Sequence, residues 1–328
     1  MFNYLEKSTQ KFVLIKESRG GLIMRLTNRD FINESDDFNK MFQFIIEDNN
    51  KKKDNFSWSI GRIVDWKYGL WREKKFFPNF FRKNAHLWFD YFGNLVGFAI
   101  SEYGDNSFYI FTVDEYPFLY EEILNWVKDN WKDREDILCT EIPETETLAI
   151  NVLENNGFIS KGICEVTRAF DCSKSIGKNI NLPEGYTYSN MKENYDPIGL
   201  RKLQLNAFRK QNNISEIDIL AAEYARESPI YKPEFDMSIV NENGMHVAGC
   251  EAFINYVNNT AEIERVCTHS EYRQMGFGKK ILTKCIQELS KHGIKRAYIT
   301  GMSDVAISLY GKLGHENEVK GICYELSK

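Results

Sequence analysis

The residues from Val266 to Lys280 have the types and the spacing of a phosphate-binding loop. An apolar run ends at Val266, a polar turn follows, and from Gly278 onward apolar residues recur at helical spacing. Gly276 and Gly278 let the backbone approach a ligand closely, and the first N–H groups of a helix have no partner within the helix. The helix dipole favours negative charge at that end. The sequence therefore predicts a strand, a glycine loop and a helix that together bind a phosphate.

The order of residues separates this loop from two common phosphate sites. Arg273, Gly276 and Gly278 form the pattern R-x-x-G-x-G. This is not the dinucleotide fingerprint G-x-G-x-x-G, and it is not a P-loop because no G-K-[ST] follows. The pattern resembles the [QR]-x-x-G-x-[GA] pyrophosphate loop of the GNAT superfamily of acetyl-CoA-dependent N-acetyltransferases.

A second segment, Ser303 to His315, resembles the N-x-x-A-x-x-L-Y-x-x-L-G-F signature of the same superfamily. Ser303 stands where the family usually has Asn, and His315 stands where it usually has Phe. The matching residues are Ala306, Leu309, Tyr310, Leu313 and Gly314. The resemblance covers residues 182–328 and implies an acetyl-CoA site. The cofactor-binding residues that it implies are Val266, Cys267, Thr268, Arg273, Gln274, Met275, Gly276, Phe277, Gly278, Lys279 and Ser303.

Acetyl transfer from a thioester to an amine needs a proton acceptor for the amine and a proton donor for the leaving thiolate. Tyr310 matches the family's tyrosine that protonates the CoA sulfur; the alternative role is a core aromatic at helical spacing with Leu313. In the family, backbone N–H groups near Val266 and Cys267 stabilise the oxyanion. A covalent route through Cys267 is disfavoured, because no motif places a His with an Asp or Asn beside it.

The strand before the loop, A-E-I-E-R-V-C-T, offers two carboxylates for the role of general base. Side chains alternate along a strand, so one face is expected to carry Glu262, Glu264 and Val266, and the other Ile263 and Arg265. Histone-acetylating members of the superfamily carry their catalytic glutamate eleven residues before the loop's first position, as Glu262 precedes Arg273 here. The resemblance therefore implies Glu262 as the base, with Glu264 or water as alternatives.

Length and composition bound the class of protein. A chain of 328 residues suggests two domains, and 43% hydrophobic residues are enough for packed cores. No leader and no run of about 18 apolar residues is found, so we expect a cytoplasmic protein without a membrane partner. Seven cysteines without a C-x-x-C pair favour neither a disulfide nor a metal site. The net charge of -5 disfavours a nucleic-acid partner and favours a cationic acceptor.

One stretch, Trp71 to Lys83, interleaves basic and aromatic residues and could by itself bind single-stranded nucleic acid. We expect its phenylalanines to pack in the interior instead, with the lysines reaching outward.

The two halves of the chain repeat one pattern of strands. Expected strands lie at 87–91, 95–101 and 107–113 in the first half, and at 235–240, 246–255 and 260–268 in the second. From Tyr116 to Gly157 is 41 positions, and from Tyr272 to Gly314 is 42. We predict an α/β (α+β) fold of two tandem GNAT-like domains, at 1–171 and 182–328. Each domain should be a mixed, mostly antiparallel sheet flanked by helices.

The first copy lacks the chemistry of the second. In place of the glycine loop it has Pro117, which has no N–H, followed by Glu121 and Glu122, whose charge opposes pyrophosphate. Leu153 stands in the place of Tyr310. A structural role is therefore expected for residues 1–171. The residues of this half that could line an acceptor pocket, although buried packing is their expected role, are Trp58, Gly61, Arg62, Asp65 and Trp66.

The predicted function is acetyl-CoA-dependent N-acetylation of the primary amine of a small cationic molecule. The domain at 182–328 should carry it, with acceptor specificity in Leu203 to Tyr231. Aminoglycosides, polyamines, amino acids and protein N-termini remain as acceptors. The alternative is an acyl-CoA sensor or protein-interaction module that keeps the loop without turnover.

Overall fold

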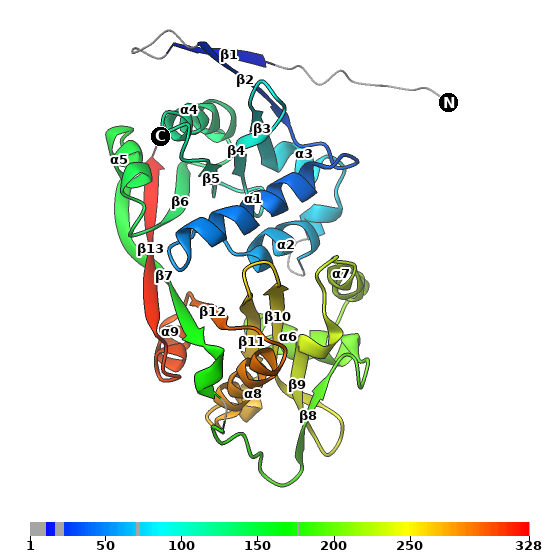
Figure 1. The fold of residues 1–328 in the computed structure, drawn as a ribbon. Helices are drawn as coiled ribbons and strands as arrows, with labels where there is room; N and C mark the ends of the chain where they lie inside the picture. The colour runs from blue at the N-terminus through cyan, green and yellow to red at the C-terminus, as the bar shows by residue number, and fades with distance from the viewer. Residues whose placement is uncertain (1–10, 17–22, 70–72, 176, 328) are drawn as a thin grey trace. The chain divides into compact units, whose positions relative to one another are not determined.

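The computed structural model describes residues 11–16, 23–69, 73–175 and 177–327 (Figure 1). Contacts within the chain define two compact units, each built from separate segments. Unit 1 comprises Met1–Asp48, Lys74–Gly162 and Ile322–Lys328, and unit 2 comprises Asn49–Glu73 and Ile163–Gly321. These units differ from the expected domains 1–171 and 182–328, because residues 49–73 and the end of the first half belong by their contacts to unit 2.

Unit 1, in the part of the chain that the structure describes, holds a five-stranded antiparallel sheet in the order β1-β2-β3-β4-β5. The strands are β1 (Lys11–Lys16), β2 (Ile23–Asp30), β3 (Ala85–Phe89), β4 (Leu95–Ile100) and β5 (Tyr109–Thr112), and β6 is Ile137–Pro143. The helices are α1 (Asp37–Lys52), α3 (Phe80–Asn84), α4 (Leu119–Trp131) and α5 (Thr147–Asn155). The apolar face of α4 packs on this sheet through Leu119, Ile123 and Val127, which are fully buried at helical spacing.

Unit 2 is built on a mixed sheet whose strands follow the order β13-β7-β12-β11-β10-β9-β8. Their bounds are β7 (Ile159–Asp171), β8 (Tyr186–Asn190), β9 (Asp236–Asn241), β10 (His246–Asn255), β11 (Thr260–Thr268), β12 (Arg296–Gly301) and β13 (Asn317–Ser327). The helices are α2 (Ile60–Tyr68), α6 (Pro197–Arg209), α7 (Glu216–Arg226), α8 (Phe277–Lys291) and α9 (Asp304–Gly311). Short 3-10 turns are η1 (Glu73–Phe76), η2 (Cys172–Ser175), η3 (Pro233–Phe235) and η4 (Ser270–Tyr272).

Helices cover both faces of the unit 2 sheet. Helix α8 lies along β9, β10 and β11 (Figure 1), and its buried stripe includes Ile281, Leu282, Cys285 and Leu289. The other face of β10 and β11 is packed by α6 and by α2. The sheet is therefore the middle layer, and residues of one strand serve two different surroundings.

The last strand of each half is exchanged. In unit 2, β12 pairs antiparallel with Val166–Asp171 of β7, although β7 ends the first half of the sequence. In unit 1, the neighbour of β6 is β13, whose residues from Ile322 onward belong to that unit. Each unit thus takes its closing strand from the other half of the chain, and sequence pattern gave no sign of this.

The predicted α/β fold with mostly antiparallel sheets and flanking helices is confirmed. Both halves also follow one element order, β3-β4-β5-α4-β6-α5-β7 and β9-β10-β11-α8-β12-α9-β13. The parallel contact recurs too: Ser107 bridges Cys139 in the first half, and Thr260 begins a parallel ladder with Arg296 in the second. The strand patterns predicted from sequence match these elements closely.

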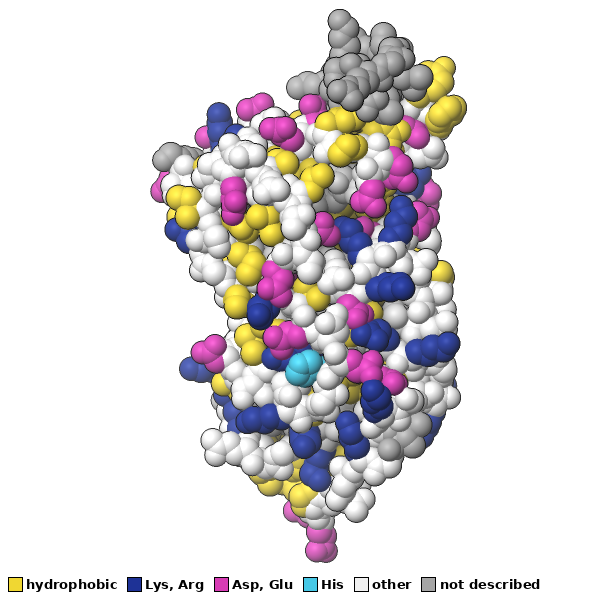
Figure 2. Space-filling model, turned by 60° about the vertical axis from the view of Figure 1, so that its left-hand side comes forward, with side chains coloured by type: hydrophobic (Ala, Val, Ile, Leu, Met, Phe, Trp, Pro, Cys, Tyr) yellow, Lys and Arg dark blue, Asp and Glu magenta, His cyan; other side chains and the backbone are white. Residues whose placement is uncertain are grey.

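The surface carries charges of both signs. On the face drawn in Figure 2, acidic side chains accompany the basic ones over most of the area, as the balance of 42 Lys and Arg against 47 Asp and Glu leads one to expect. Of the basic and aromatic stretch, Trp71 and Arg72 lie outside the described residues, Phe80 and Phe81 are buried, and Phe77 is exposed. No helix among the described residues is long and apolar enough to cross a membrane.

Candidate active site

The glycine loop joins β11 to α8 with an open helix end. Gln274 and Gly276 have φ of 65° and 78°, and a Cβ atom at Gly276 would meet nothing within 4 Å. Gly276 is the N-cap and supplies no side-chain bond, while the first intrahelical bond printed at this end runs from the Lys280 N–H to its carbonyl. The N–H groups of residues 277–279 therefore point out of the helix end. With no acidic residue in the first turn, this end suits a pyrophosphate.

Two hydrogen bonds tie this loop to the end of α6. The Ser270 N–H donates to Asn206 Oδ1 at 2.8 Å, and Arg273 Nη2 donates to the carbonyl of Ala207 at 3.0 Å. The guanidinium of Arg273, a residue expected to bind the cofactor, thus also holds the loop in place. Asn206 was missed by sequence reasoning, since a lone Asn in a helical pattern carries no signal of a contact so far along the chain.

The parallel strands β11 and β12 separate beside this loop. Their ladder runs from Thr260 to Glu262 on β11, paired with residues 296–298, although β11 continues to Thr268 and β12 to Gly301. Beyond Glu262, among the described residues, the β12 side of β11 has no ladder partner. Val266 and Cys267 lie in this part, so their backbone groups are available to a bound ligand.

Tyr310 reaches this opening from α9. Its ring belongs to the core with Leu313, but its hydroxyl makes no hydrogen bond to a described residue. Burial raises the pKa of Tyr310, and the charges of Glu264 and Cys267 raise it further. The hydroxyl therefore keeps its proton at neutral pH, as a proton donor must.

Gly278 shows how closely the predicted parts converge. A Cβ atom placed on it would lie 3.4 Å from Leu309 Cδ2 on α9 and 3.4 Å from Thr268 Oγ1 at the end of β11. The start of α8, the end of β11 and the helix of Tyr310 thus meet at one place. Ser303 is the N-cap of α9, and its Oγ accepts the Ala306 N–H at 3.3 Å, so this residue has a structural role beside its expected contact with the cofactor.

The alternation expected along β11 is wrong after Glu264. Arg265 has φ of 53°, and the register with β10 shifts between the pairs Gly249 with Cys267 and Glu251 with Glu264. Two residues of β11 oppose one residue of β10, which is a β-bulge. The bulge turns the side chains that follow it.

The bulge regroups the residues of the strand. Val266, expected beside Glu262, packs instead against the core under α8. Arg265, expected on the opposite face, forms ion pairs with Asp65 of α2 and Glu251 of β10. Arg265 therefore lies on the face that carries α2 and α6.

Two carboxyl groups on this face interact with each other. Glu262 is buried and Glu264 is half-buried, and the two side chains are hydrogen-bonded. Burial raises the pKa of Glu262 well above its usual range, and the charges of Glu264 and Asp65 add to the effect. Burial likewise raises the pKa of Glu264, to about 7. Such a pair shares a proton near neutral pH and titrates as a unit.

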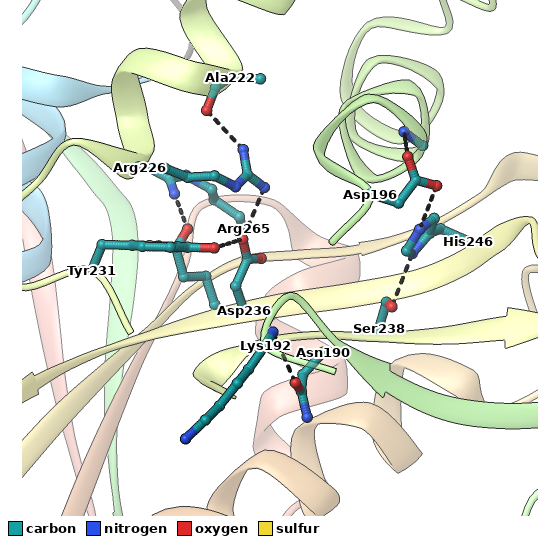
Figure 3. Close-up of polar contacts among 12 residues, drawn as sticks. Asn190, Lys192, Asp196, Ala222, Arg226, Tyr231, Asp236, Ser238, His246 and Arg265 are labelled. Carbon is teal, nitrogen blue, oxygen red and sulfur yellow. Dashed lines mark hydrogen bonds and ion pairs between the residues drawn. The ribbon is translucent and has the colours of Figure 1, made fainter. Parts of the chain in front are cut away.

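The cations on this face are already paired. Arg226 donates to Asp236 Oδ2 at 2.9 Å and to the carbonyl of Ala222 at 2.7 Å, and Tyr231 also donates to Asp236 at 3.0 Å (Figure 3). Arg265 pairs with acids as described above. Neither Glu262 nor Glu264 forms an ion pair with a described residue, so this carboxyl pair is left to a cation from outside.

Farther along α6, Asp196, His246 and Ser238 form a hydrogen-bonded chain (Figure 3). His246 Nδ1 lies 2.9 Å from Ser238 Oγ, and Nε2 lies 3.2 Å from Asp196 Oδ2. The order matches a nucleophilic triad, but Ser238 has 0% exposure and no substrate reaches it. Asp196 also caps α6, so the chain of contacts fixes the start of that helix.

A cavity of about 450 Å³ opens near this chain of contacts, where α6 meets the turn before β10. Its lining residues include Lys202, His246, His269 and Glu271, and none of the residues predicted for the acetyl-CoA site. The cavity and the predicted site are therefore separate places on unit 2.

Comparison with known proteins gives the family. Residues 198–315 match the model of the acetyltransferase (GNAT) family. No curated protein sequence matches the chain. Similar solved structures include a GCN5-related N-acetyltransferase from Sphaerobacter thermophilus, with 14% identity, 92% of this chain and 95% of that chain covered, and a TM-score of 0.60.

Two further structures of this kind match over the same share of the chain. A tandem GNAT protein from the clavulanic acid biosynthesis pathway has 10% identity, 92% and 98% coverage and a TM-score of 0.62. A GNAT-family acetyltransferase from Colwellia psychrerythraea has 13% identity, 92% and 99% coverage and a TM-score of 0.60. This chain therefore has the fold of the tandem GNAT proteins, and its residues 198–315 belong to the GNAT acetyltransferase family.

Proposed function

We propose that this protein is a cytoplasmic, acetyl-CoA-dependent N-acetyltransferase that acts on the primary amine of a small cationic molecule. One observation carries the proposal. The unbonded hydroxyl of Tyr310 lies where β11 and β12 separate, near Glu264 and Cys267 and beside the open end of α8. A proton donor, a carboxyl pair and an anion site thus converge on one opening.

The residues of the chain divide the work as follows. When bound, acetyl-CoA supplies the activated thioester. The N–H groups at the start of α8, with Lys279 nearby, hold the pyrophosphate. Backbone N–H groups near Val266 and Cys267 stabilise the oxyanion. Tyr310 gives a proton to the leaving thiolate. Arg273, Gln274 and Met275 shape the loop, and Ser303 borders the site at the start of α9.

The carboxyl pair serves the amine. We assign the general base to Glu262, acting as one unit with Glu264 through their shared hydrogen bond. Once ionised, the pair attracts a positively charged acceptor, since neither carboxyl has a cationic partner among the described residues. It then takes the proton that the ammonium group must lose before the nitrogen attacks. A raised pKa suits this task, because a base near neutral pH is strong enough to accept that proton.

The experiment is release of free CoA from acetyl-CoA, detected with a thiol reagent, against a panel of polyamines, aminoglycosides, amino acids and peptide N-termini. Release that depends on an added amine is expected. The other reading of the chain, an acyl-CoA sensor, predicts that acetyl-CoA binds and no amine in the panel causes release. The second result would contradict the proposed function.

A further inference from the structure

Helix α2 comes from the first half of the sequence, yet it belongs to unit 2 and packs on β10 and β11. Its N-cap is Ser59, which is buried. Ser59 Oγ accepts the Gly61 N–H at 3.3 Å and donates its own proton to Glu262 Oε2. The first turn of α2 therefore ends on the carboxyl group assigned as the base.

Gly61 provides the space for this contact. A Cβ atom on Gly61 would fall well inside contact distance of Glu262 Oε2 and lie 2.7 Å from Phe253 Cδ2. Gly61 is not in a left-handed conformation, so backbone freedom is not the reason for a glycine here. The reason is the close approach of the carboxyl group to the backbone of the helix, with Phe253 on its other side.

We propose that Ser59 is a positioning residue that holds the Glu262 carboxyl in its working orientation, with Gly61 giving it room. The first half of the chain then completes the active site of the second. This inference rests on the proposed function. Ser59 touches the base and not the reacting atoms, so its effect is expected in the proton affinity of the base.

The charged groups around Glu262 set the direction of that effect. Glu264 faces it from β11, and Asp65 and Arg62 face it from α2. Arg62 is engaged by Glu165 at 3.4 Å, and Asp65 by Arg265. The hydroxyl of Ser59 is thus the neutral donor that stabilises the ionised carboxyl directly. Its removal should raise the apparent pKa of the carboxyl pair.

The test is the pH profile of kcat/KM for Ser59→Ala. A hydrogen bond to a charged group is strong enough to move its pKa by about one to two units. The acid limb should therefore shift to higher pH by about one unit or more, with a roughly tenfold loss of kcat/KM per unit below the limb. The affinity for CoA should stay unchanged. Ser59→Thr keeps the hydroxyl and should restore the profile.

Two further variants separate positioning from loss of a helix cap. Glycine is nearly as good an N-cap as serine, so Ser59→Gly removes the hydroxyl at little cost to the helix and should shift the limb as Ser59→Ala does. Ser57→Ala is the matched control, because Ser57 is two residues away and makes no side-chain hydrogen bond among the described residues. It should leave both the profile and the melting temperature unchanged.

The possible failures are distinguishable. A wild-type protein that acetylates no amine overturns the proposed function, and this inference with it. An active wild-type protein whose acid limb is unmoved in both Ser59→Ala and Ser59→Gly overturns the positioning role alone. A shifted limb in Ser57→Ala would also overturn it, since the shift would then not depend on the contact with Glu262.

Discussion

Tyr310 has a ring that belongs to the core and a hydroxyl that does not. Because the hydroxyl makes no hydrogen bond within the described chain, Tyr310→Phe removes a proton donor and keeps the packing. Turnover should fall about a hundredfold or more, with the melting temperature nearly unchanged. Steady-state kinetics and thermal denaturation measure the two effects. Unchanged turnover, where chemistry limits the rate, would leave Tyr310 as a core aromatic only.

The pH dependence of the reaction should report the carboxyl pair. The raised pKa of Glu262 means that the base is protonated at low pH, so kcat/KM should rise as pH increases through the apparent pKa of the pair. Glu262→Gln should lower kcat/KM at neutral pH and abolish or displace this acid limb, while CoA binds as before. Glu264→Gln is the matched variant. If Glu262→Gln keeps the wild-type rate and limb, and Glu264→Gln does not, the base is Glu264.

The same pair should make stability depend on pH. Burial raises the pKa of Glu264 from 4.5 to about 7, so the folded state holds a proton that the unfolded state releases. This contribution to stability is present below about pH 4.5 and is lost as pH rises toward 7. We expect Glu264→Gln to flatten the fall of the melting temperature over this range. Parallel curves for the wild type and the variant would contradict the raised pKa.

The β-bulge in β11 marks the limit of prediction at the scale of one element. The bounds of β10, β11 and α8 followed from local periodicity, which depends only on neighbouring residues. The left-handed conformation of Arg265 did not, because arginine seldom adopts it and the cost is offset by ion pairs with Asp65 and Glu251, far away in sequence. The glycine loop and Tyr310 were predictable as motifs; the contacts of Ser59 and Asn206 depend on packing that no motif records.

Helix α8 provides a matched pair of glycines for testing the anion site. Gly276 precedes the helix and Gly293 follows it, both with positive φ and with nothing within 4 Å of an added Cβ. Gly276→Glu puts strain and a negative charge at the end that should bind pyrophosphate, so CoA affinity should drop strongly. Gly293→Glu brings similar strain at the opposite end. Equal losses of CoA affinity in the two variants, measured by calorimetry, would argue against a site at the start of α8.

The whole molecule should bind one CoA. Helix α4 holds the place in the first half that α8 holds in the second, but it carries Glu121 and Glu122 in its first turn, whereas α8 has no acid there. Pro117 also removes an N–H from the preceding loop. Titration calorimetry should give a stoichiometry of about one per chain. Two sites of comparable affinity would mean that the first half is not degenerate.

The exchange of closing strands has a consequence for how the chain is made. Residues 322–327 of β13 complete unit 1, but they leave the ribosome only after residues 163–321. At about 5–20 residues per second, synthesis of these roughly 160 residues takes about 8 to 30 seconds. During that time, the edge of β6 that β13 will cover waits without its partner. Glu141 and Pro143 in β6 are residue types that discourage pairing with another chain, so the nascent protein carries its own protection through the wait.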